Sequence, residues 1–272
     1  MKRIGVLLSV ALLGLCLMGC GANNEEDNSL TVGMECAYAP FNWLSNEASD
    51  TSVALENGGY CDGYDVMIAQ RIADGLGKEL VVRQIGWDAL IPSLQNGDID
   101  MIIAGMTADE DREEVADFTT PYFESADMVM IVNKGSEEAT YTDIQDFSGK
   151  KVVGQSGTNY DTVIDQIEGV EHMTPRDNYA EMVVALQNGD VDGITAELAV
   201  AEGVVSANSD LTYITFEEGH GFDIDTSVSI ALKEGSRDTE TFKEVQSILD
   251  AISLEEREEM MALATANQPA SE

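Results

Sequence analysis

The sequence predicts an α/β protein of two similar lobes, each with a mixed, mostly parallel sheet. The segment LQNGDID at residues 94–100 recurs as LQNGDVD at 186–192. Each copy has the pattern of an amphipathic helix that stops at Asn-Gly and continues through Asp into a short apolar strand. Strand and helix patterns also alternate along most of the chain, which is typical of sheets covered by helices on both faces. Turn chemistry alone also produces such joints, so the repeat indicates architecture and not function.

In the first half of the chain, short apolar runs predict strands and helical periodicity predicts helices. The helix expected at 64–75 has apolar residues at Val66, Ile68, Ala69 and Ile72. Acidic residues at the start of 109–115 suit the positive end of a helix dipole. The expected strands are 30–34, 80–83, 101–104 and 128–132, and the expected helices are 64–75, 87–95 and 109–115.

The second half repeats this alternation. The expected strands are 151–154, 193–196 and 227–232, and the expected helices are 158–167, 178–187, 198–206, 236–252 and 254–263. Ligands of such sheets bind beyond the carboxyl ends of the strands. The segments that follow the two repeat strands, 104–107 and 196–197, are therefore the first places to look for a site.

Residues 1–19 have the pattern of a signal peptide, with two basic residues before an apolar run at 4–18 that is short for a membrane-spanning helix. The sequence LMGC at 17–20 resembles the bacterial lipobox, which implies that Cys20 is lipidated after cleavage before it. An ordinary secretory signal with a free Cys20 is the alternative. Residues 20–29 are polar and acidic, as a flexible tether to a membrane anchor would be.

The chain is strongly acidic, with 51 Asp and Glu against 14 Lys and Arg and a formal net charge of −37. Nucleic acids and anionic membrane surfaces are themselves polyanions, so this charge argues against both as partners. The acidity also keeps an exported protein soluble and attracts cations over about 10 Å.

Cys36 and Cys61 flank a polar segment at 45–59 that has the composition of a long loop or hairpin. In an exported protein such a pair is a candidate disulfide, which would hold this loop in place; two unpaired thiols are the alternative. His172 and His220 lie far apart without Cys partners, so no metal site is expected. We expect no cofactor, since neither a phosphate loop nor a Ser nucleophile elbow occurs.

A series of motifs, in one order along residues 30–232, resembles the polar amino-acid binding proteins of ABC importers, the family-3 solute-binding proteins. The motifs are VGMECAYAPF at 32–41, GYDV at 63–66, WDALIPSL at 87–94, AGMT at 104–107, Arg112, DFTTPY at 117–122 and VGQSGT at 153–158. Two features depart from the family. Met67 replaces a usual acidic residue, and the tail after Ser253 lacks the usual aromatic ending.

The resemblance implies the periplasmic-binding-protein type II fold, with two Rossmann-like lobes joined by two hinge crossings near 124–128 and 223–227. Lobe 1 would comprise 30–126 and 227–272, and lobe 2 would comprise 127–226. It further implies a monomeric, lipid-anchored receptor outside the bacterial cytoplasmic membrane. This receptor would capture a free L-amino acid between its lobes and pass it to an ABC permease driven by its ATPase.

For the ligand carboxylate, the family role falls on Arg112, because guanidinium matches carboxylate geometry and keeps its charge. Thr158 opens a helix whose N–H groups can bind the same carboxylate, and Gly157 precedes it in the motif. From spacing alone, Arg112 is better explained as a surface residue that pairs with Asp109, Glu113 or Glu114. Thr158 has a plain helix cap as its alternative role.

For the ligand ammonium, the resemblance implies Glu197, where the family has Asp. Alternatively, Glu197 is only an acidic residue that stabilises the start of the helix that follows it. The ligand-binding set also takes Ala104, Gly105 and Thr107 from the AGMT motif. Gly105 can offer its carbonyl, and Thr107 its hydroxyl and N–H.

For the ligand side chain, Tyr38 and Trp87 hold the positions of the family's aromatic walls, with core packing as the alternative. Glu35 stands at the far end of this slot and favours Arg, Lys, ornithine, His or Gln. A residue that only orients loop hydrogen bonds would look the same in the sequence.

Two other function classes remain open. The same fold hosts dehydratases of cyclohexadienyl acids, for which Glu35 or Glu197 could act as general acid. A sensory amino-acid receptor that signals through a partner is the other. The binding protein is the function that we expect, without enzymatic activity.

Overall fold

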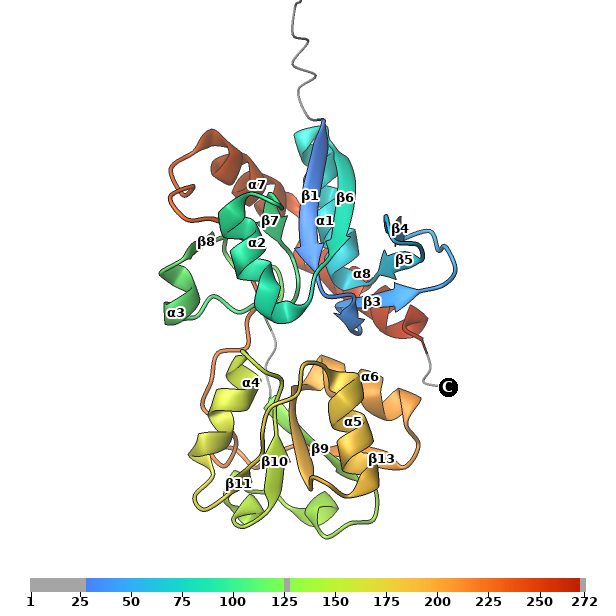
Figure 1. The fold of residues 1–272 in the computed structure, drawn as a ribbon, viewed down its shortest axis with the longest axis vertical. Coiled ribbons are helices and arrows are strands. Elements are labelled where there is room, and N and C mark those ends of the chain that lie inside the picture. Colours follow the sequence, from blue (N-terminus) through green and yellow to red (C-terminus); the bar gives the residue numbers. More distant parts are fainter. Residues whose placement is uncertain (1–27, 125–127, 270–272) are drawn as a thin grey trace, which may run out of the picture.

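The computed structural model describes residues 28–124 and 128–269 (Figure 1). The predicted signal peptide, Cys20 and most of the tether lie outside these residues, as does part of the first predicted hinge crossing. In the described part, no helix combines the length and apolar character that crossing a membrane requires.

Lobe 1, the upper body in Figure 1, is built on a five-stranded sheet of order β6-β1-β7-β14-β8. Its strands are β1 (Ser29–Met34), β6 (Glu79–Gln84), β7 (Met101–Ile102), β8 (Ala116–Phe118) and β14 (Ala231–Lys233). Its helices are α1 (Tyr64–Leu76), α2 (Leu90–Asn96), α3 (Glu110–Glu113), α7 (Glu240–Ala251) and α8 (Leu254–Asn267). A 3₁₀ turn, Trp87–Ala89, leads into α2.

Lobe 2 is built on a second five-stranded sheet, of order β11-β10-β12-β9-β13. Its strands are β9 (Met128–Asn133), β10 (Lys151–Val153), β11 (Glu171–His172), β12 (Gly193–Glu197) and β13 (Leu211–Ile214). Its α-helices are α4 (Asn159–Thr162), α5 (Tyr179–Asn188) and α6 (Leu198–Ala207). The 3₁₀ turns are Glu138–Thr140, Ile144–Phe147 and Val163–Gln166.

The two sheets share one plan. In each, the first strand of the lobe's βαβ units, β1 or β10, pairs in parallel with a strand on either side. The strand next to the repeat strand, β14 or β9, is antiparallel, because it belongs to the chain that has just crossed from the other lobe. Among the described strands of the two sheets, four pairings are parallel and four antiparallel, so the sheets are mixed.

The repeated segment makes the same contacts in both lobes. Gly97 ends α2 and Gly189 ends α5, each in the left-handed conformation, with φ of 80° and 77°. The last Asp of each repeat copy then accepts a hydrogen bond of 2.8 Å from a backbone N–H of the neighbouring strand. Asp100 accepts from Thr31 of β1, and Asp192 accepts from Lys151 of β10. The repeat therefore joins each helix to its sheet in an equivalent way.

A small sheet of order β2-β3-β5-β4 lies beside lobe 1, and the sequence did not predict it. Its strands are β2 (Ala37–Tyr38), β3 (Asn42–Ser45), β4 (Val53–Ala54) and β5 (Tyr60–Asp62). The disulfide between Cys36 and Cys61, with Cα atoms 5.7 Å apart, ties the start of this sheet to β5. The polar segment between the cysteines therefore folds back on itself as antiparallel strands of this sheet.

Several expected elements are shorter in the structure. The strand expected at 101–104 is only Met101–Ile102, and the helices expected at 109–115 and 158–167 are the α-helices Glu110–Glu113 and Asn159–Thr162. The strand expected at 227–232 is regular only as β14, because the N–H groups of Ser229 and Ile230 bond to Met106 O and Thr119 Oγ1. The helix expected from 236 begins later as α7, because Thr239 Oγ1 caps it by accepting from the N–H of Phe242.

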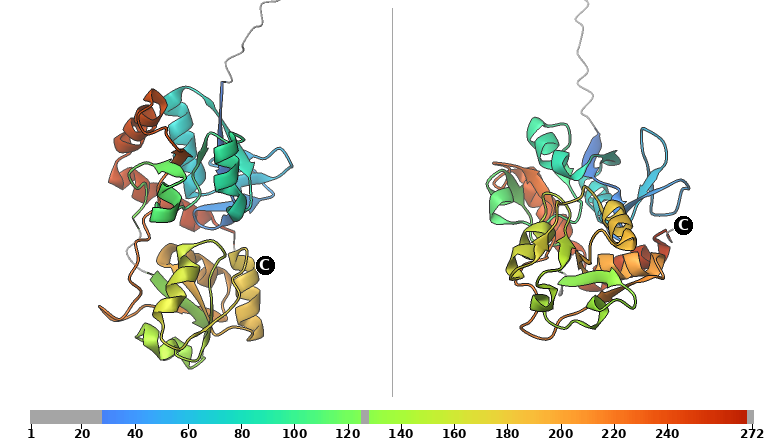
Figure 2. Two further views of the ribbon diagram at one scale, coloured as in Figure 1. Left: turned by 60° about the vertical axis from the view of Figure 1, so that its left-hand side comes forward. Right: turned by 60° about the horizontal axis from the view of Figure 1, so that its bottom comes forward.

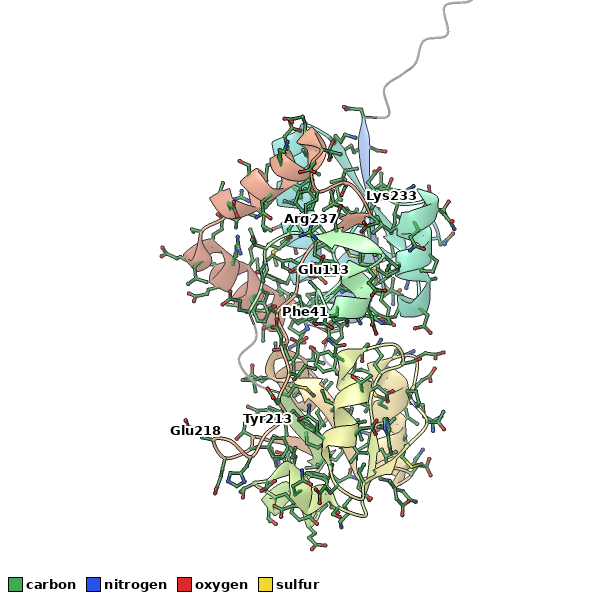
Figure 3. The ribbon with its side chains drawn as sticks, turned by 90° about the vertical axis from the view of Figure 1, so that its left-hand side faces the viewer. Phe41, Glu113, Tyr213, Glu218, Lys233 and Arg237 are labelled. Carbon is green, nitrogen blue, oxygen red and sulfur yellow. A yellow bond between two sulfur atoms is a disulfide. The ribbon has the colours of Figure 1, made fainter. Side chains whose placement is uncertain are left out.

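The two lobes lie one above the other, and the segment between β13 and β14 runs along one side of both (Figure 2). Phe123 and Val228, on the two chain segments that pass between the lobes, form an isolated antiparallel bridge. Phe41 lies where the lobes meet (Figure 3), stacked against Tyr38 with ring centroids 5.3 Å apart. Aromatic packing thus continues from the lobe 1 core to the boundary.

Candidate functional site

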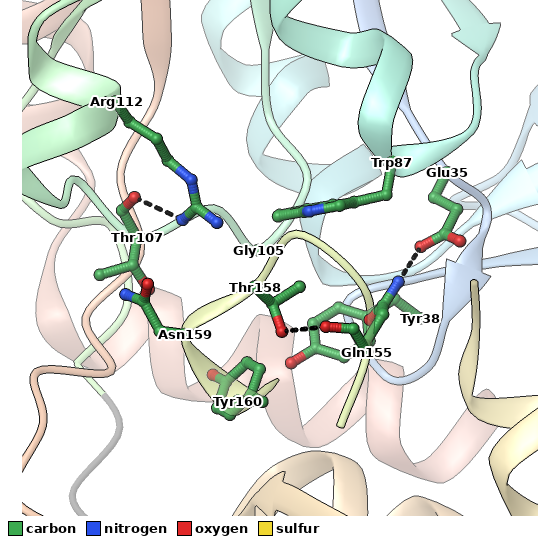
Figure 4. Close-up of a pocket in the computed structure, with 10 residues that line it drawn as sticks. All are labelled: Glu35, Tyr38, Trp87, Gly105, Thr107, Arg112, Gln155, Thr158, Asn159 and Tyr160. Atoms are coloured by element: carbon green, nitrogen blue, oxygen red, sulfur yellow. Dashed lines mark hydrogen bonds between the residues drawn. The ribbon is translucent and has the colours of Figure 1, made fainter. Parts of the chain in front are cut away.

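Side chains from both lobes surround a narrow cavity that is partly open to solvent (Figure 4). Lobe 1 supplies six lining residues and lobe 2 supplies four. They are Glu35, Tyr38, Trp87, Gly105, Thr107 and Arg112 from lobe 1, with Gln155, Thr158, Asn159 and Tyr160 from lobe 2. The cavity lies beyond the carboxyl ends of β7 and β10, so the repeat pointed to its lining in lobe 1, whereas 196–197 in lobe 2 do not line it.

Arg112 reaches the cavity from α3. Asp109 caps this short helix by accepting from the Arg112 N–H and also lies 3.2 Å from Arg112 Nη1. Nη1 donates to Thr107 O at 2.9 Å, and Nη2 donates to Gly157 O of lobe 2 at 3.0 Å. Burial lowers the pKa of Arg112, and Asp109 opposes that shift, so the group stays a cation. The two sequence interpretations, a partner of Asp109 and a cavity cation, are therefore compatible.

Trp87 forms the roof of the cavity beside Arg112. The guanidinium carbon lies 5.3 Å from the indole centroid, within cation–π range. Trp87 Nε1 donates to Gly157 O at 3.0 Å, so one lobe 2 carbonyl receives hydrogen bonds from two lobe 1 side chains. Gly157 has φ of 67°, and a Cβ there would lie 2.7 Å from Asp88 Oδ1. Glycine is thus required both by its conformation and by the close approach of the lobes.

The far end of the cavity is acidic. Gln155 Nε2 donates to Glu35 Oε2 at 3.2 Å across the lobes and to Asp177 O at 3.0 Å. Burial raises the pKa of Glu35 to about 7; the Gln155 hydrogen bond opposes this, and Asp88 and Asp177 reinforce it. Three carboxylates close together disfavour one another's charge, so this end is suited to a cation or to a hydrogen-bond donor.

Glu197 lies at the end of β12 and is fully buried. Its Oε1 accepts a short hydrogen bond from the hydroxyl of Tyr38, which belongs to lobe 1. Burial raises the pKa of Glu197 to about 8, while its hydrogen bonds act in the opposite direction. The ring of Tyr38 lies between Phe41 and Tyr179, which hold it in place. Glu197 therefore lies behind Tyr38 and does not line the cavity surface.

Gly105 is held by a buried network. Its N–H donates to Tyr122 Oη at 3.0 Å, and that hydroxyl donates to Asp65 Oδ1 at 2.7 Å. Gly105 has φ of 63°, and a Cβ there would lie 2.8 Å from the ring of Tyr38. The close approach of this glycine to the aromatic ring excludes any larger residue.

Seven of the ten residues expected to bind ligand line the cavity. The other three lie just behind it: Ala104 is buried, Gly157 receives the two lobe 1 donors, and Glu197 is covered by Tyr38. The sequence missed Gln155, Asn159 and Tyr160. They flank the recognised Gly157-Thr158 pair, so adjacency to that motif was the available signal. In the described ranges no group of His, Cys, Asp or Glu is arranged to hold a metal ion.

Thr158 precedes α4, as expected, but its hydroxyl does not cap that helix. Instead Thr158 Oγ1 donates to Gln155 O at 2.8 Å. This bond closes the 155–158 turn. A second, more open pocket shares Arg112, Thr158 and Asn159 with the cavity and is acidic, with Asp109, Asp111 and Asp161 in its lining.

Several known proteins are similar to this chain in sequence or in structure. The model of the bacterial extracellular solute-binding proteins, family 3, matches residues 30–257. A probable histidine-binding protein of Campylobacter jejuni is 31% identical over 234 residues, 82% of this chain and 85% of that protein. The ABC transporter glutamine-binding protein GlnH of Bacillus subtilis is 33% identical over 86% of this chain and 90% of that protein. The crystal structure of the amino acid ABC transporter substrate-binding protein AbpA from Streptococcus pneumoniae, bound to L-arginine, is similar with a TM-score of 0.76 and 26% identity, covering 88% of this chain and 95% of that one.

Proposed function

The chain belongs to the bacterial extracellular solute-binding proteins of family 3, and on that premise we propose that it captures a polar L-amino acid between its lobes for an ABC importer. Its α/β fold is that of the type II periplasmic binding proteins. The observation that carries the proposal is one cavity with a buried arginine at one side and a buried carboxylate behind the other. A zwitterion matches this pair, because its carboxylate meets the arginine and its ammonium favours the charged form of Glu197 against the effect of burial.

The ligand carboxylate would lie against Arg112, Thr107 and the backbone N–H groups around Thr158. Charge-assisted hydrogen bonds in a buried site are stronger than those in water, so these groups would supply much of the affinity. The ammonium would lie toward Glu197 and the carbonyl of Gly105. Ligand binding would then bring together groups from both lobes.

The side chain of the ligand would extend between Tyr38 and Trp87 toward Glu35. The acidic group of Glu35, Asp88 and Asp177 favours a cationic or amide side chain. Relatives named for histidine and glutamine, and a similar structure bound to arginine, support this class of ligand. Flat aromatic walls accommodate both apolar stems and delocalised cations.

Lobe closure would couple binding to transport. Lobe 1, residues 30–126 with 227–272, would rotate against lobe 2, residues 127–226, about the crossings near 124–128 and 223–227. Only the closed form contacts the ligand from both sides, so the ligand stabilises it. The closed protein, as a monomer, would dock on a permease whose ATPase drives uptake.

The N-terminal sequence supports a location outside the cytoplasmic membrane. Residues 1–19 would be removed and Cys20 lipidated, so that residues 20–29 tether the receptor to the outer face of the membrane. Metabolic labelling with a fatty-acid probe tests the anchor. Label that persists after Cys20→Ala would contradict it.

Arg112 gives the sharpest test of the site. A thermal-shift screen of the mature protein against the common amino acids and cystine identifies the ligand, since binding raises the melting temperature. Arg112→Ala should then abolish calorimetric binding of every amino acid, a loss of at least about a hundredfold. Arg237→Ala is the matched control. That arginine pairs with Glu113 and Asp117 away from the cavity (Figure 3), and its loss should leave the affinity unchanged. Unchanged affinity in Arg112→Ala would refute the site.

A second candidate function is general-acid catalysis on a cyclohexadienyl acid. It is favoured by one observation: burial raises the pKa of Glu35 to about 7 and that of Glu197 to about 8, so both carry protons near neutral pH. Incubation with prephenate or arogenate and absorbance monitoring tests it. Turnover that disappears in Glu35→Gln or Glu197→Gln would establish enzymatic activity. Absence of turnover in the unmodified protein would exclude this activity and leave amino-acid binding as the function.

A further inference from the structure

The backbone of Cys36 lies in the left-handed region, with φ of 53°. Among residues 28–124 and 128–269, Cys36 is the one residue other than glycine with a positive φ. A Cβ disfavours this conformation by roughly a factor of ten in population, and cysteine is not among the residue types that adopt it often. Such a conformation persists where the surrounding structure imposes it. The turn at Cys36 is therefore held by its contacts and not by its own preference.

The disulfide supplies this constraint. Cys36 is bonded to Cys61, and both residues are buried. Cys61 lies in β5, which pairs with β3 on one side and with β4 on the other, so that Cys61 faces Leu44 and Val53 in the two ladders. The sulfur of Cys36 is thereby fixed to an inner strand of the small sheet. Relaxation of Cys36 to an ordinary negative φ would have to displace that sulfur.

The turn at Cys36 lies between two residues of the candidate site. Glu35 precedes it, Tyr38 follows it by two positions, and both line the cavity. Each also makes a hydrogen bond to lobe 2: Glu35 accepts from Gln155, and Tyr38 donates to Glu197. Rotation about φ of residue 36 turns the chain on one side of it against the other. It would therefore move Glu35 and Tyr38 relative to each other.

A second fixed point follows Tyr38 along the chain. The carbonyl groups of Pro40 and Phe41 accept from the N–H groups of Tyr64 and Asp65 at the start of α1, at 3.1 and 2.8 Å. Tyr38 thus lies between two attachments of its segment, the disulfide on one side and α1 on the other. Without the disulfide the segment keeps only the attachment to α1, and the tyrosine ring is less firmly placed.

We propose that the disulfide positions the binding cavity. By imposing the left-handed turn at Cys36, it fixes Glu35 and Tyr38, which form the slot for the ligand side chain. This inference rests on the proposed function and goes beyond stabilisation of the fold by the bridge to Cys61. Arg112, which would receive the ligand carboxylate, lies on another segment and keeps its contacts. The disulfide therefore controls affinity through the side-chain end of the cavity.

The test separates positioning from stabilisation by comparing variants of the mature protein that all carry Cys61→Ala. The alanine variant adds Cys36→Ala, whose Cβ disfavours the left-handed turn, and the glycine variant adds Cys36→Gly, which adopts that turn freely. A control variant adds Ala37→Gly to the alanine variant, because Ala37 is exposed and has no positive φ. Circular dichroism checks that each variant is folded. Calorimetry measures the affinity for L-arginine, L-histidine and L-glutamine.

The alanine variant should bind the best of the three amino acids about tenfold or more weakly than the unmodified protein. The glycine variant should recover most of that loss, to within about threefold of the unmodified protein. This order opposes the usual effect of glycine, which destabilises by giving the unfolded chain more freedom. The control variant should recover none of the loss, since its added glycine does not lie at the left-handed position.

Unchanged affinity in the alanine variant, or an equal loss in the alanine and glycine variants, would overturn the positioning role while the binding function stands. Loss of folding in both would assign the disulfide to the fold as a whole and would overturn the role as well. If only the alanine variant fails to fold, near-normal affinity in the glycine variant supports the role and weak binding overturns it. If none of the three amino acids binds the unmodified protein, both this inference and the assignment of a cationic or amide ligand fall.

Discussion

Asp65, near the start of α1, is a fully buried carboxylate whose charge the fold tolerates at a cost. Its Oδ1 accepts from Tyr122 Oη at 2.7 Å, and its Oδ2 accepts from Asn42 Nδ2 at 2.7 Å. Burial raises the pKa of Asp65 from 3.8 to about 6, although both hydrogen bonds act to lower it. Since Tyr122 also accepts from the N–H of Gly105, this carboxylate supports the floor of the cavity.

Asp65→Asn removes the charge and can keep every hydrogen bond. Asn42 Oδ1 has no partner in the part of the chain that the structure describes, so the Asn42 amide can turn over and accept from the new amide. The raised pKa means that Asp65 favours the folded state fully below pH 3.8 and that this contribution is lost as the pH rises through about 6. At about 1.36 kcal/mol per pH unit, the step from 3.8 to about 6 corresponds to about 3 kcal/mol.

We therefore expect Asp65→Asn to unfold at higher urea than the unmodified protein at neutral pH. The difference in unfolding free energy should approach about 3 kcal/mol above about pH 7 and vanish below about pH 4. Urea unfolding at a series of pH values measures it, and the difference between the two proteins cancels the other titrating groups. Asp65→Ala is the control: it also removes the charge but leaves Tyr122 and Asn42 without an acceptor, so it should be less stable than Asp65→Asn at every pH. A difference between Asp65→Asn and the unmodified protein that does not vary with pH would refute the reasoning.

Three further outcomes follow from the structure. Tyr38→Phe removes the interlobe hydrogen bond to Glu197 and should weaken ligand binding about tenfold in calorimetry; unchanged affinity would show that the bond is incidental. Gly105→Ala places a Cβ 2.8 Å from the Tyr38 ring and should abolish binding, whereas Gly97→Ala, with open space around it, should lower the melting temperature but keep the affinity. Replacing Cys36 and Cys61 by Ser removes a link across 25 residues and should cost about 3 kcal/mol of unfolding free energy, so an unaltered urea midpoint would argue against a stabilising bridge.

Local rules made the architecture predictable. The left-handed glycines that end α2 and α5 need no tertiary contact to be recognised, because Asn-Gly after an amphipathic run stops a helix. The small sheet of β2–β5 escaped prediction for the opposite reason. Its strands are two to four residues long, too short for periodicity, and they form only because each finds a partner.

The candidate site was predictable only in part. Motif order indicated Arg112 and Glu35, since the chemistry of an amino acid calls for a fixed cation and a polar slot. It did not indicate Gln155 or Tyr160, because polar and aromatic residues near a turn are ordinary. Their significance depends on what lies opposite: Gln155 bonds to Glu35 across the lobes, and Tyr160 stands beside Glu197 and Tyr38.

By itself, the sequence determined the two-lobed plan, the joints of the repeat and the candidate cysteine pair, because each depends on periodicity, turn chemistry or composition within a short stretch. Tertiary structure alone decided that Tyr38 bonds to Glu197, 159 positions away, and that Arg112 and Trp87 share the carbonyl of Gly157. Those contacts join separate lobes, so they depend on how two packed bodies meet. No local pattern encodes that meeting, and it is what turns scattered polar residues into one cavity.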